Sequence, residues 1–495
     1  MSTKGGAGGK SIYTYTSNVT GYICKMLHFR RLRGLILPLF LIFPSIIFCS
    51  LATAADEADL LRAKIATLES ELSLARSDLE KVLASQGQSV EQSLEQQPMA
   101  DSEPAQGGMV IGPVTIGGAM RVNYVYGSYE GVDGGPSRGG DGGNVELDTF
   151  RINASLDAGP WLGKLEYRWY PASSGKSYSF FHTGWLGYQL DNDSHLEVGL
   201  NRVPFGAGPY GISQSWFFDQ HYYVGLADDP DLGIKYSSAG EDWSWDAAYY
   251  WRSEPSFFGR SEDSTRYGYD AVRWRETVAA DGSINFDERR SGYRERDQGN
   301  LRLIRHLKGD DWELDLGSSL QYGKLQGSGV DDGSHWAGSV HAVSRLENFI
   351  LGLQVSRYGL DIDEDNPWRT DELIPFGAYD FAWPVATDSW LPAVSLSYRI
   401  DTPQIPWLDY VLPYLEYSSI IKLDSQLNDS ELAVVGAAWA SGGWYIYSDL
   451  AYSNGNYFVG DEGDDYGRID GVGDFGVSGN SDWNYRFNIN FGYYY

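Results

Sequence analysis

From Gly107 onwards the chain repeats one pattern, in which apolar and polar side chains alternate for about ten residues before a turn rich in Gly, Asp, Asn and Ser. In the first such segment one row reads Val114, Ile116, Gly118, Met120, Val122, Tyr124 and Tyr126, and the other reads Thr115, Gly117, Ala119, Arg121, Asn123 and Val125. Because successive side chains of a strand point to opposite faces, this pattern predicts strands with one apolar and one polar face.

Sixteen segments of this kind occupy the 389 residues from Gly107 to Tyr495. They are expected near Val114–Tyr126, Thr149–Leu156, Trp161–Trp169, Phe180–Leu190, Ser194–Val203, Leu232–Ser238, Trp243–Trp251, Asn300–His306, Trp312–Tyr322, His335–Leu346, Asn348–Tyr358, Pro392–Ile400, Asp409–Ile421, Glu431–Ala440, Gly443–Tyr452 and Trp483–Tyr495. Their apolar rows begin and end in aromatic rings, as rows facing a bilayer do at its two interfaces. The prediction is therefore all-β: a transmembrane antiparallel barrel of about 16 strands, wide enough to hold water.

The last segment has the most regular pattern. Its outward row is Trp483, Tyr485, Phe487, Ile489, Phe491, Tyr493 and Tyr495, and its inward row is Asn484, Arg486, Asn488, Asn490 and Gly492. In water such an aromatic row would be an aggregation site, whereas in a bilayer it is the correct surface. The terminal aromatic residue, Tyr495, also resembles the C-terminal signal that the outer-membrane barrel-assembly machinery reads.

The first 54 residues read as a targeting region. Basic residues 28–33 precede an apolar run from Leu35 to Phe48, and small residues at Ala52 and Ala54 suit cleavage after Ala54. Translation starting at Met26 would give this region the more usual form of a secretory signal. The alternative is an uncleaved membrane anchor, for which the apolar run is short.

Residues 55–84 carry a heptad pattern. Ala58, Ile65, Leu72 and Leu79 take the a positions, and Leu61, Leu68, Ala75 and Val82 take the d positions. This pattern predicts a short parallel coiled coil, and the alternative is one amphipathic helix lying on another surface. Residues 85–106, rich in Gln, Ser and Glu, are expected to form a flexible linker.

The charge of the chain excludes one class of partner. The formal charge is −29, and removing the six basic residues of the first 54 leaves 32 basic against 67 acidic residues, a net charge of −35. A role in nucleic-acid binding is therefore not expected. Both cysteines, Cys24 and Cys49, lie in the targeting region, so the mature chain has no disulfide and no thiolate metal site.

A signal, a short coiled coil, a linker and a barrel of 16 strands together resemble the trimeric Gram-negative porins. Within them, the run from Leu196 to Gly206 resembles the strand and Val-Pro-Phe-Gly turn (here ending Pro204, Phe205, Gly206) of the phosphate-selective porin O/P-like and DcaP-like group. The resemblance implies a homotrimer in the outer membrane, in contact with lipid and lipopolysaccharide. A dense run of Lys and Arg is missing, so phosphate selectivity is not implied.

The long segment that follows this turn, residues 207–231, is a candidate constriction loop. It is rich in Gly and in aromatic residues. The side chains expected to narrow the pore are Trp216, Phe217, Phe218, His221, Tyr222 and Tyr223. By strand parity the inward basic residues are Arg121, Arg151, Lys164, Arg168 and Arg486. Three consecutive strands contribute Arg121, Arg151 and Arg168, which could form a basic ladder favouring carboxylates or phosphates. The alternative is that each arginine pairs with a lumenal acid such as Glu166 or Glu197.

The remaining charged segments suggest no chemistry. Residues 253–297 mix eight arginines with ten acids and are expected to form an outer salt-bridged rim. The acidic clusters 361–365 and 461–465 fit no calcium-loop spacing and are read as solvated loops. No catalytic set, metal site or cofactor motif is recognisable.

The sequence thus favours a channel for passive diffusion of small hydrophilic, anionic solutes. Three alternatives remain: a barrel that anchors the envelope to peptidoglycan through its coiled coil, an enzyme built on a barrel, and a secreted β-sandwich that binds or cleaves sugars.

Overall fold

The structure is a computed structural model of the chain. It describes residues 108–129, 143–171, 177–254, 266–274, 277–278, 284–285, 291–364, 370–379, 381–423, 427–456, 458–460 and 482–495. The targeting region, the coiled coil and the linker lie outside these residues, so their predictions stay predictions. The same holds for the acidic cluster 461–465.

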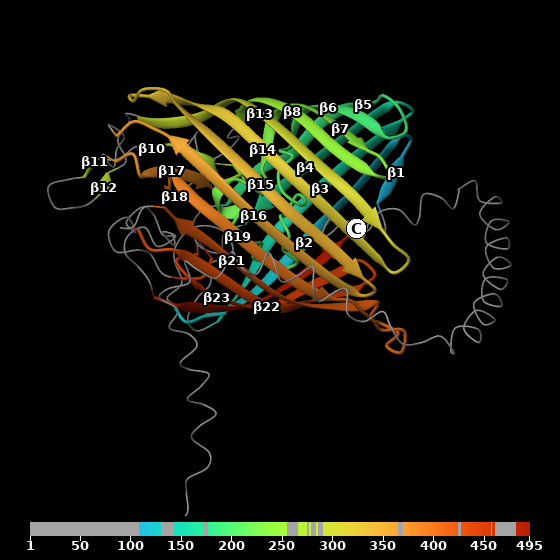
Figure 1. Ribbon diagram of the computed structural model, residues 1–495. Coiled ribbons are helices and arrows are strands. Elements are labelled where there is room, and N and C mark those ends of the chain that lie inside the picture. Colours follow the sequence, from blue (N-terminus) through green and yellow to red (C-terminus); the bar gives the residue numbers. More distant parts are fainter. Residues whose placement is uncertain are drawn as a thin grey trace, which may run out of the picture. The chain divides into compact units, whose positions relative to one another are not determined.

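Sixteen antiparallel strands form a closed barrel, as the alternation predicts (Figure 1). They are β2 (Val114–Gly127), β3 (Asn144–Ala158), β4 (Trp161–Tyr170), β5 (Tyr178–Gln189), β6 (Ser194–Arg202), β7 (Pro230–Ala239), β8 (Trp243–Ser253), β13 (Ser291–Lys308), β14 (Trp312–Ser328), β15 (Gly333–Leu346), β16 (Phe349–Asp361), β19 (Asp388–Tyr398), β21 (Tyr410–Lys422), β22 (Ser430–Ser441), β23 (Trp444–Asn454) and β24 (Asn484–Tyr494). Each strand pairs with the next, and β24 closes the ring on β2, where Ala119 pairs with Tyr494 and Gly127 with Arg486. All sixteen expected segments are confirmed.

Side chains alternate across the wall as expected. On β24 the row from Trp483 to Tyr495 faces outward, with Phe491, Tyr493 and Tyr495 exposed, while Arg486, Asn488 and Asn490 are fully buried on the inner side. The same alternation leaves Met120, Ile152 and Leu165 exposed on the outside. A closed ring pairs the backbone groups of every strand, and an apolar exterior is the surface that a bilayer requires.

The connections differ at the two ends of the barrel. One end carries short turns, such as residues 159–160, 309–311 and 442–443, and the other carries long segments, such as 203–229, 254–290 and 362–387. In bacterial barrels the short turns are periplasmic and the long loops extracellular.

Short strands that the alternation did not predict lie outside the ring or within the long loops (Figure 1). They are β1 (Met109–Ile111), β9 (Asp270–Ala271), β10 (Arg273–Trp274), β11 (Thr277–Val278), β12 (Ile284–Asn285), β17 (Leu373–Ala378), β18 (Phe381–Ala386) and β20 (Ile400–Asp401). Strands β18, β17 and β9 form a separate three-stranded sheet at the long-loop end. Segments of two to six residues are too short for a period-two pattern to identify.

A single 3-10 turn, η2 (Tyr222–Val224), is the helical element in the described part of the chain. Among these residues no helix has the length and apolar character needed to cross a membrane.

Candidate channel constriction

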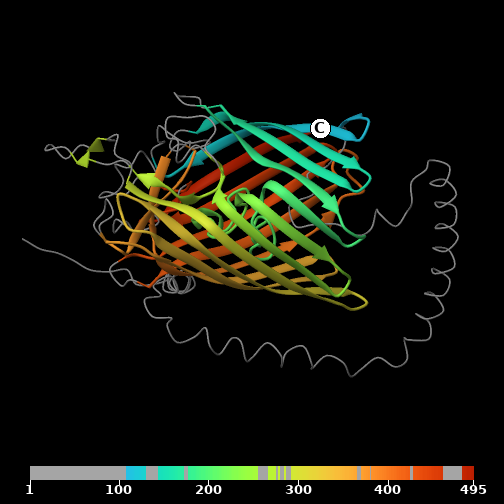
Figure 2. The same cartoon turned by 90° about the horizontal axis from the view of Figure 1, so that it is seen from above.

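The segment between β6 and β7, residues 203–229, folds into the barrel instead of extending from its rim (Figure 2), and we call it the inserted loop. Its first residues bind the wall at β14 and β16. The amide of Gly206 donates to Ser319 Oγ at 3.0 Å, and the amide of Ala207 donates to Gln354 Oε1 at 3.1 Å. The loop is therefore fixed to the wall directly after the Val-Pro-Phe-Gly turn.

Further along, the inserted loop binds the wall formed by β21 to β23. Ser213 Oγ donates to a carboxylate oxygen of Glu416 at 2.6 Å, and the other carboxylate oxygen accepts from the amide of Gln214. The amide of Trp216 donates to Asp449 Oδ2 at 3.0 Å. These contacts involve strands far from β6 and β7 in the ring, so the loop extends across the lumen.

The turn itself depends on Gly206. Phe205 is buried, and Gly206 has a φ of 69°, a conformation that favours glycine. A Cβ atom at Gly206 would lie 2.6 Å from the side-chain nitrogen of Gln354, which is one of the loop's anchors. The glycine is therefore needed both for the backbone conformation and for close approach to the wall.

We expect Gly206→Ala to lower the free energy of unfolding by more than the ~1–2 kcal/mol that the left-handed backbone alone costs a residue with a Cβ. Gly112→Ala is the matched control, because Gly112 has a φ of 61° and nothing within 4 Å of the added Cβ. Urea titration of both variants in detergent measures the difference. Equal losses would show that the contact with Gln354 contributes nothing.

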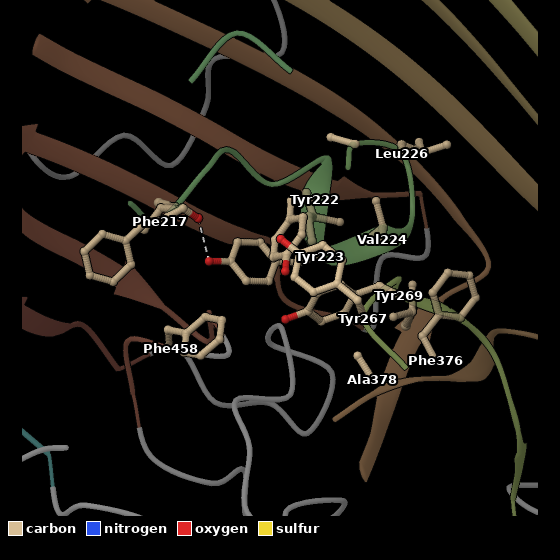
Figure 3. Close-up of a cluster of buried hydrophobic side chains, with 14 of the residues drawn as sticks. Phe217, Tyr222, Tyr223, Val224, Leu226, Tyr267, Tyr269, Phe376, Ala378 and Phe458 are labelled. Carbon is tan, nitrogen blue, oxygen red and sulfur yellow. Dashed lines mark hydrogen bonds between the residues drawn. The ribbon is translucent and has the colours of Figure 1, made fainter. Parts of the chain in front are cut away.

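Aromatic side chains hold the other side of the inserted loop (Figure 3). Phe217, Tyr222 and Tyr223 are buried, and Tyr223 donates its hydroxyl to the carbonyl of Phe217 at 2.6 Å. They pack in one cluster with rings from three other long loops and with β17: Tyr267, Tyr269, Phe376, Tyr379 and Phe458. Burial raises the pKa of Tyr222 and of Tyr223 above its usual range, so both phenols stay neutral. Trp216 and Phe218 pack at the edge of this cluster.

His221 links the inserted loop to β16. Its Nε2 lies 2.8 Å from Ser356 Oγ, and its Nδ1 lies 2.8 Å from Asp219 Oδ1. This is the order of groups in a Ser-His-Asp triad. However, all three side chains are buried, and the hydroxyl of Ser356 also lies 2.9 Å from Ser339 Oγ. We therefore interpret the arrangement as a tether for the loop.

The five basic residues expected inside the barrel have different surroundings. Lys164 is exposed, and the side chain of Arg121 is 15% exposed with its Nε 3.1 Å from Asp148. Arg151 and Arg168 are buried and share Glu166, to which Arg151 Nη1 lies 3.9 Å away.

Arg486, the fifth of these residues, is covered by the inserted loop. Its guanidinium lies 4.8 Å from the ring centroid of Trp216 and 5.3 Å from that of Phe217, and it donates to Asn488 Oδ1 at 2.8 Å. The structure therefore does not join Arg121, Arg151 and Arg168 into one accessible ladder: Arg121 and Lys164 are accessible, whereas Arg151, Arg168 and Arg486 are enclosed.

Three further inward cations were not among the candidates. Arg202 pairs with Asp228 at 2.7 Å, Lys235 with Glu197 at 2.9 Å, and Arg302 with Asp246 at 2.7 Å. In each pair the cation is the more exposed partner, at 19%, 13% and 21% against 0%, 8% and 9% for the acids. Strand parity could have identified Lys235 and Arg302, because both alternate with exposed apolar residues.

The carboxylate of Asp228 remains charged in spite of its position. Burial alone would raise its pKa, but the guanidinium of Arg202 and the ring of His182 hold the pKa of Asp228 below its usual range. Asp228 thus forms a fixed negative partner at the end of the inserted loop.

Part of the segment expected to form an outer rim is buried instead. Arg266 pairs with Asp270 at 3.1 Å, and Tyr267, Tyr269 and Ala271 are enclosed beside the inserted loop. The prediction of an outer salt-bridged rim is therefore wrong in position for residues 266–272, which are ion-paired but buried, because aromatic side chains pack this stretch into the cluster of the inserted loop.

No protein-family model matches the chain, and no curated protein matches it. Among solved structures, the outer membrane channel DcaP of Acinetobacter baumannii is similar with a TM-score of 0.47 and 10% identity over 77% of this chain and 97% of that one. OmpT of Vibrio cholerae has a TM-score of 0.45 and 13% identity over 79% and 100% of the two chains. The anion-selective porin from Comamonas acidovorans has a TM-score of 0.44 and 12% identity over 77% and 99%. The assignment of the barrel rests on the pairing of its own sixteen strands.

Proposed function

We propose that this protein is an outer-membrane channel, without enzymatic activity, through which small hydrophilic and preferentially anionic solutes such as carboxylates or phosphate diffuse passively. The observation that carries the proposal is the loop held inside a barrel of sixteen strands. A barrel of this size encloses water, and a loop fixed within it sets the size of the solutes that pass.

The placement of the inserted loop supports a preference for anions. The loop is hydrogen-bonded to β14, β16 and β21 to β23, and we infer that solutes pass along the opposite wall, formed by β2 to β8. On that wall Arg121, Arg202 and Lys235 are more exposed than the acids that they pair with, and Lys164 is exposed as well. Solutes would therefore meet cations first, with the balancing acids behind them.

Recording from the purified protein in planar bilayers tests the channel. Stepwise increases in conductance are expected as molecules insert. A preparation that is folded, as shown by its heat-dependent migration in gels, but that produces no steps would overturn the proposal.

Replacing Arg121 and Lys164 with glutamine should shift the selectivity toward cations. At about 7 Å in water one unit charge changes the energy of a passing ion by ~0.6 kcal/mol, or about threefold in permeability. The reversal potential in unequal salt measures the shift. Arg305→Gln with Lys324→Gln is the matched control, since both residues alternate with inward positions and lie on the outer side. An equal shift of the reversal potential in the control would show that Arg121 and Lys164 do not set the ion selectivity.

The assembly is part of the same proposal. The heptads of residues 55–84 favour a parallel periplasmic coiled coil, and the resemblance to trimeric porins suggests that it joins a homotrimer, while lipid and lipopolysaccharide would surround the barrel. Tyr495 would serve recognition by the barrel-assembly machinery. Crosslinking of the full chain and of a chain lacking residues 55–106 tests the trimer, and a peptidoglycan pull-down with the same pair tests the anchoring alternative.

A further inference from the structure

Four carboxylates meet where the inserted loop rejoins the wall. They belong to Asp229 at the end of the loop, Asp231 in β7, Glu254 directly after β8, and Asp270 in β9. All four residues are buried, and one oxygen from each lies within 4.8 Å of the others. Four segments of the chain thus place negative charge at one point.

Positive charge at this point is scarce. Arg266 Nη1 lies 3.1 Å from Asp270 Oδ2 and also donates to Ser253 Oγ at 2.9 Å. Among the described residues this is the one ion pair that reaches any of the four acids. A fifth buried acid, Glu295, lies nearby and accepts a hydrogen bond from the amide of Ala271 at 3.0 Å. Buried carboxylates in such excess are strongly unfavourable unless something neutralises them.

Unpartnered oxygens point to what is missing. Each of the four residues has one buried carboxylate oxygen without a hydrogen-bond partner: Asp229 Oδ1, Asp231 Oδ1, Glu254 Oε2 and Asp270 Oδ1. Asp229 is only 4% exposed, and within the described part of the chain no hydrogen bond or ion pair reaches its carboxylate. Buried polar groups normally have partners, so an unpartnered oxygen on each of four converging carboxylates indicates a ligand.

Gly268 allows the carboxylates to converge. A Cβ atom at this position would lie 2.8 Å from Asp229 Oδ1 and 3.1 Å from both oxygens of Glu254. The amides of Gly268 and Tyr267 also donate to Glu254 Oε1, at 2.6 Å and 3.0 Å, and hold this carboxylate in place. The backbone here is therefore arranged around the acids.

We propose that Asp229, Asp231, Glu254 and Asp270 bind one calcium ion. Calcium takes six to eight oxygen ligands, several of them carboxylates, at ~2.3–2.6 Å, whereas magnesium usually keeps several waters and is bound by only one or two carboxylates. Water completes the coordination. The ion joins the end of the inserted loop and the segment 266–272 to β7 and β8, and it thereby locks the constriction to the wall.

Luminescence of terbium, which occupies calcium sites, tests the proposal on the purified full chain after treatment with a chelator. Tyr267 and Tyr269 flank Gly268, whose amide binds Glu254, and their rings should sensitise the bound ion. We expect emission that saturates at one terbium per chain, that calcium displaces at lower concentration than magnesium, and a calcium-dependent rise in the thermal unfolding midpoint. Absence of saturable emission, or displacement by magnesium before calcium, would overturn the calcium site.

Variants separate this site from other acidic surfaces. Asp231→Asn with Glu254→Gln should abolish the emission and the calcium-dependent stabilisation. Asp361→Asn with Asp363→Asn removes the same charge from an acidic cluster at the long-loop end and should change neither. Emission that survives in the first variant, or that is lost in the second, contradicts the assignment. If the first variant does not fold, the proposal is judged on the unmodified protein, by the number of terbium ions bound per chain and by whether calcium displaces terbium at lower concentration than magnesium. The site does not depend on the channel proposal, since binding is measured without transport.

Discussion

Single-channel conductance should rise severalfold when Glu416 and Asp449 are both replaced by alanine. The two carboxylates hold the inserted loop against the far wall, through Ser213 and Gln214 on one side and the amide of Trp216 on the other. Hydrogen bonds to charged groups contribute ~1.5–3 kcal/mol each, so their joint loss should free residues 213–216 from the wall. The remainder of the loop stays in its aromatic cluster, and a second passage opens between residues 213–216 and the wall of β21 to β23, in addition to the one along β2 to β8.

The control for this prediction removes the same charge from the lumen without touching the loop. Asp246→Ala with Asp315→Ala does so, because these acids bind Ser237, Arg302, His306 and Arg345 instead. Conductance in planar bilayers and cleavage of the inserted loop by added protease are measured together. If both double variants conduct alike, the increase comes from lost charge, and the anchoring role of Glu416 and Asp449 is wrong.

The second large effect is expected from Glu166→Gln. Glu166 is the buried acid between Arg168 and Arg151, and His182 Nδ1 lies 3.8 Å from its Oε1. Removing the charge of Glu166 leaves the buried guanidinium groups of Arg151 and Arg168 without the carboxylate that they share. Breaking a buried pair in this way lowers the free energy of unfolding by ~3–5 kcal/mol. Urea unfolding in detergent, followed by tryptophan fluorescence, measures the loss.

Two comparisons identify the cause of that loss. Glu313→Gln removes an equal charge from a pair with Lys308 whose side chains are 47% and 62% exposed, and it should cost less than ~1 kcal/mol. Adding Arg168→Gln to Glu166→Gln removes the uncompensated cation and should recover part of the stability. A double variant less stable than the sum of the single changes would contradict the electrostatic explanation.

The strands could be predicted from the sequence because the signal for them is local. Val114 to Tyr126 alternates residue by residue, and β2 runs from Val114 to Gly127. The alternation predicts too short a strand where a strand continues beyond the bilayer. For example, β13 begins at Ser291, well before the expected Asn300. Outside the membrane a strand no longer needs an apolar face, so the alternation fades while the backbone pairing continues.

The candidate site could be predicted only in part. Inward direction followed from parity, which correctly placed Arg121, Arg168 and Arg486 on the inner side. The surroundings of these side chains could not be predicted from parity, because the ion pairs of an arginine depend on residues of neighbouring strands and of loops. Arg486 is covered by Trp216 and Phe217, which precede it by more than 260 residues in the chain. No periodic signal in one segment reports such a contact.

The sequence by itself therefore determined the all-β barrel, its sixteen strands and its apolar exterior, since these depend on the two-residue period of a strand and on the solvent at each face. The tertiary structure alone decided that residues 203–229 lie inside the barrel, that Arg151 and Arg168 share Glu166, and that Asp229, Asp231, Glu254 and Asp270 meet. These features arise from long loops whose conformations depend on side chains distant in sequence, where charge and shape must match in three dimensions.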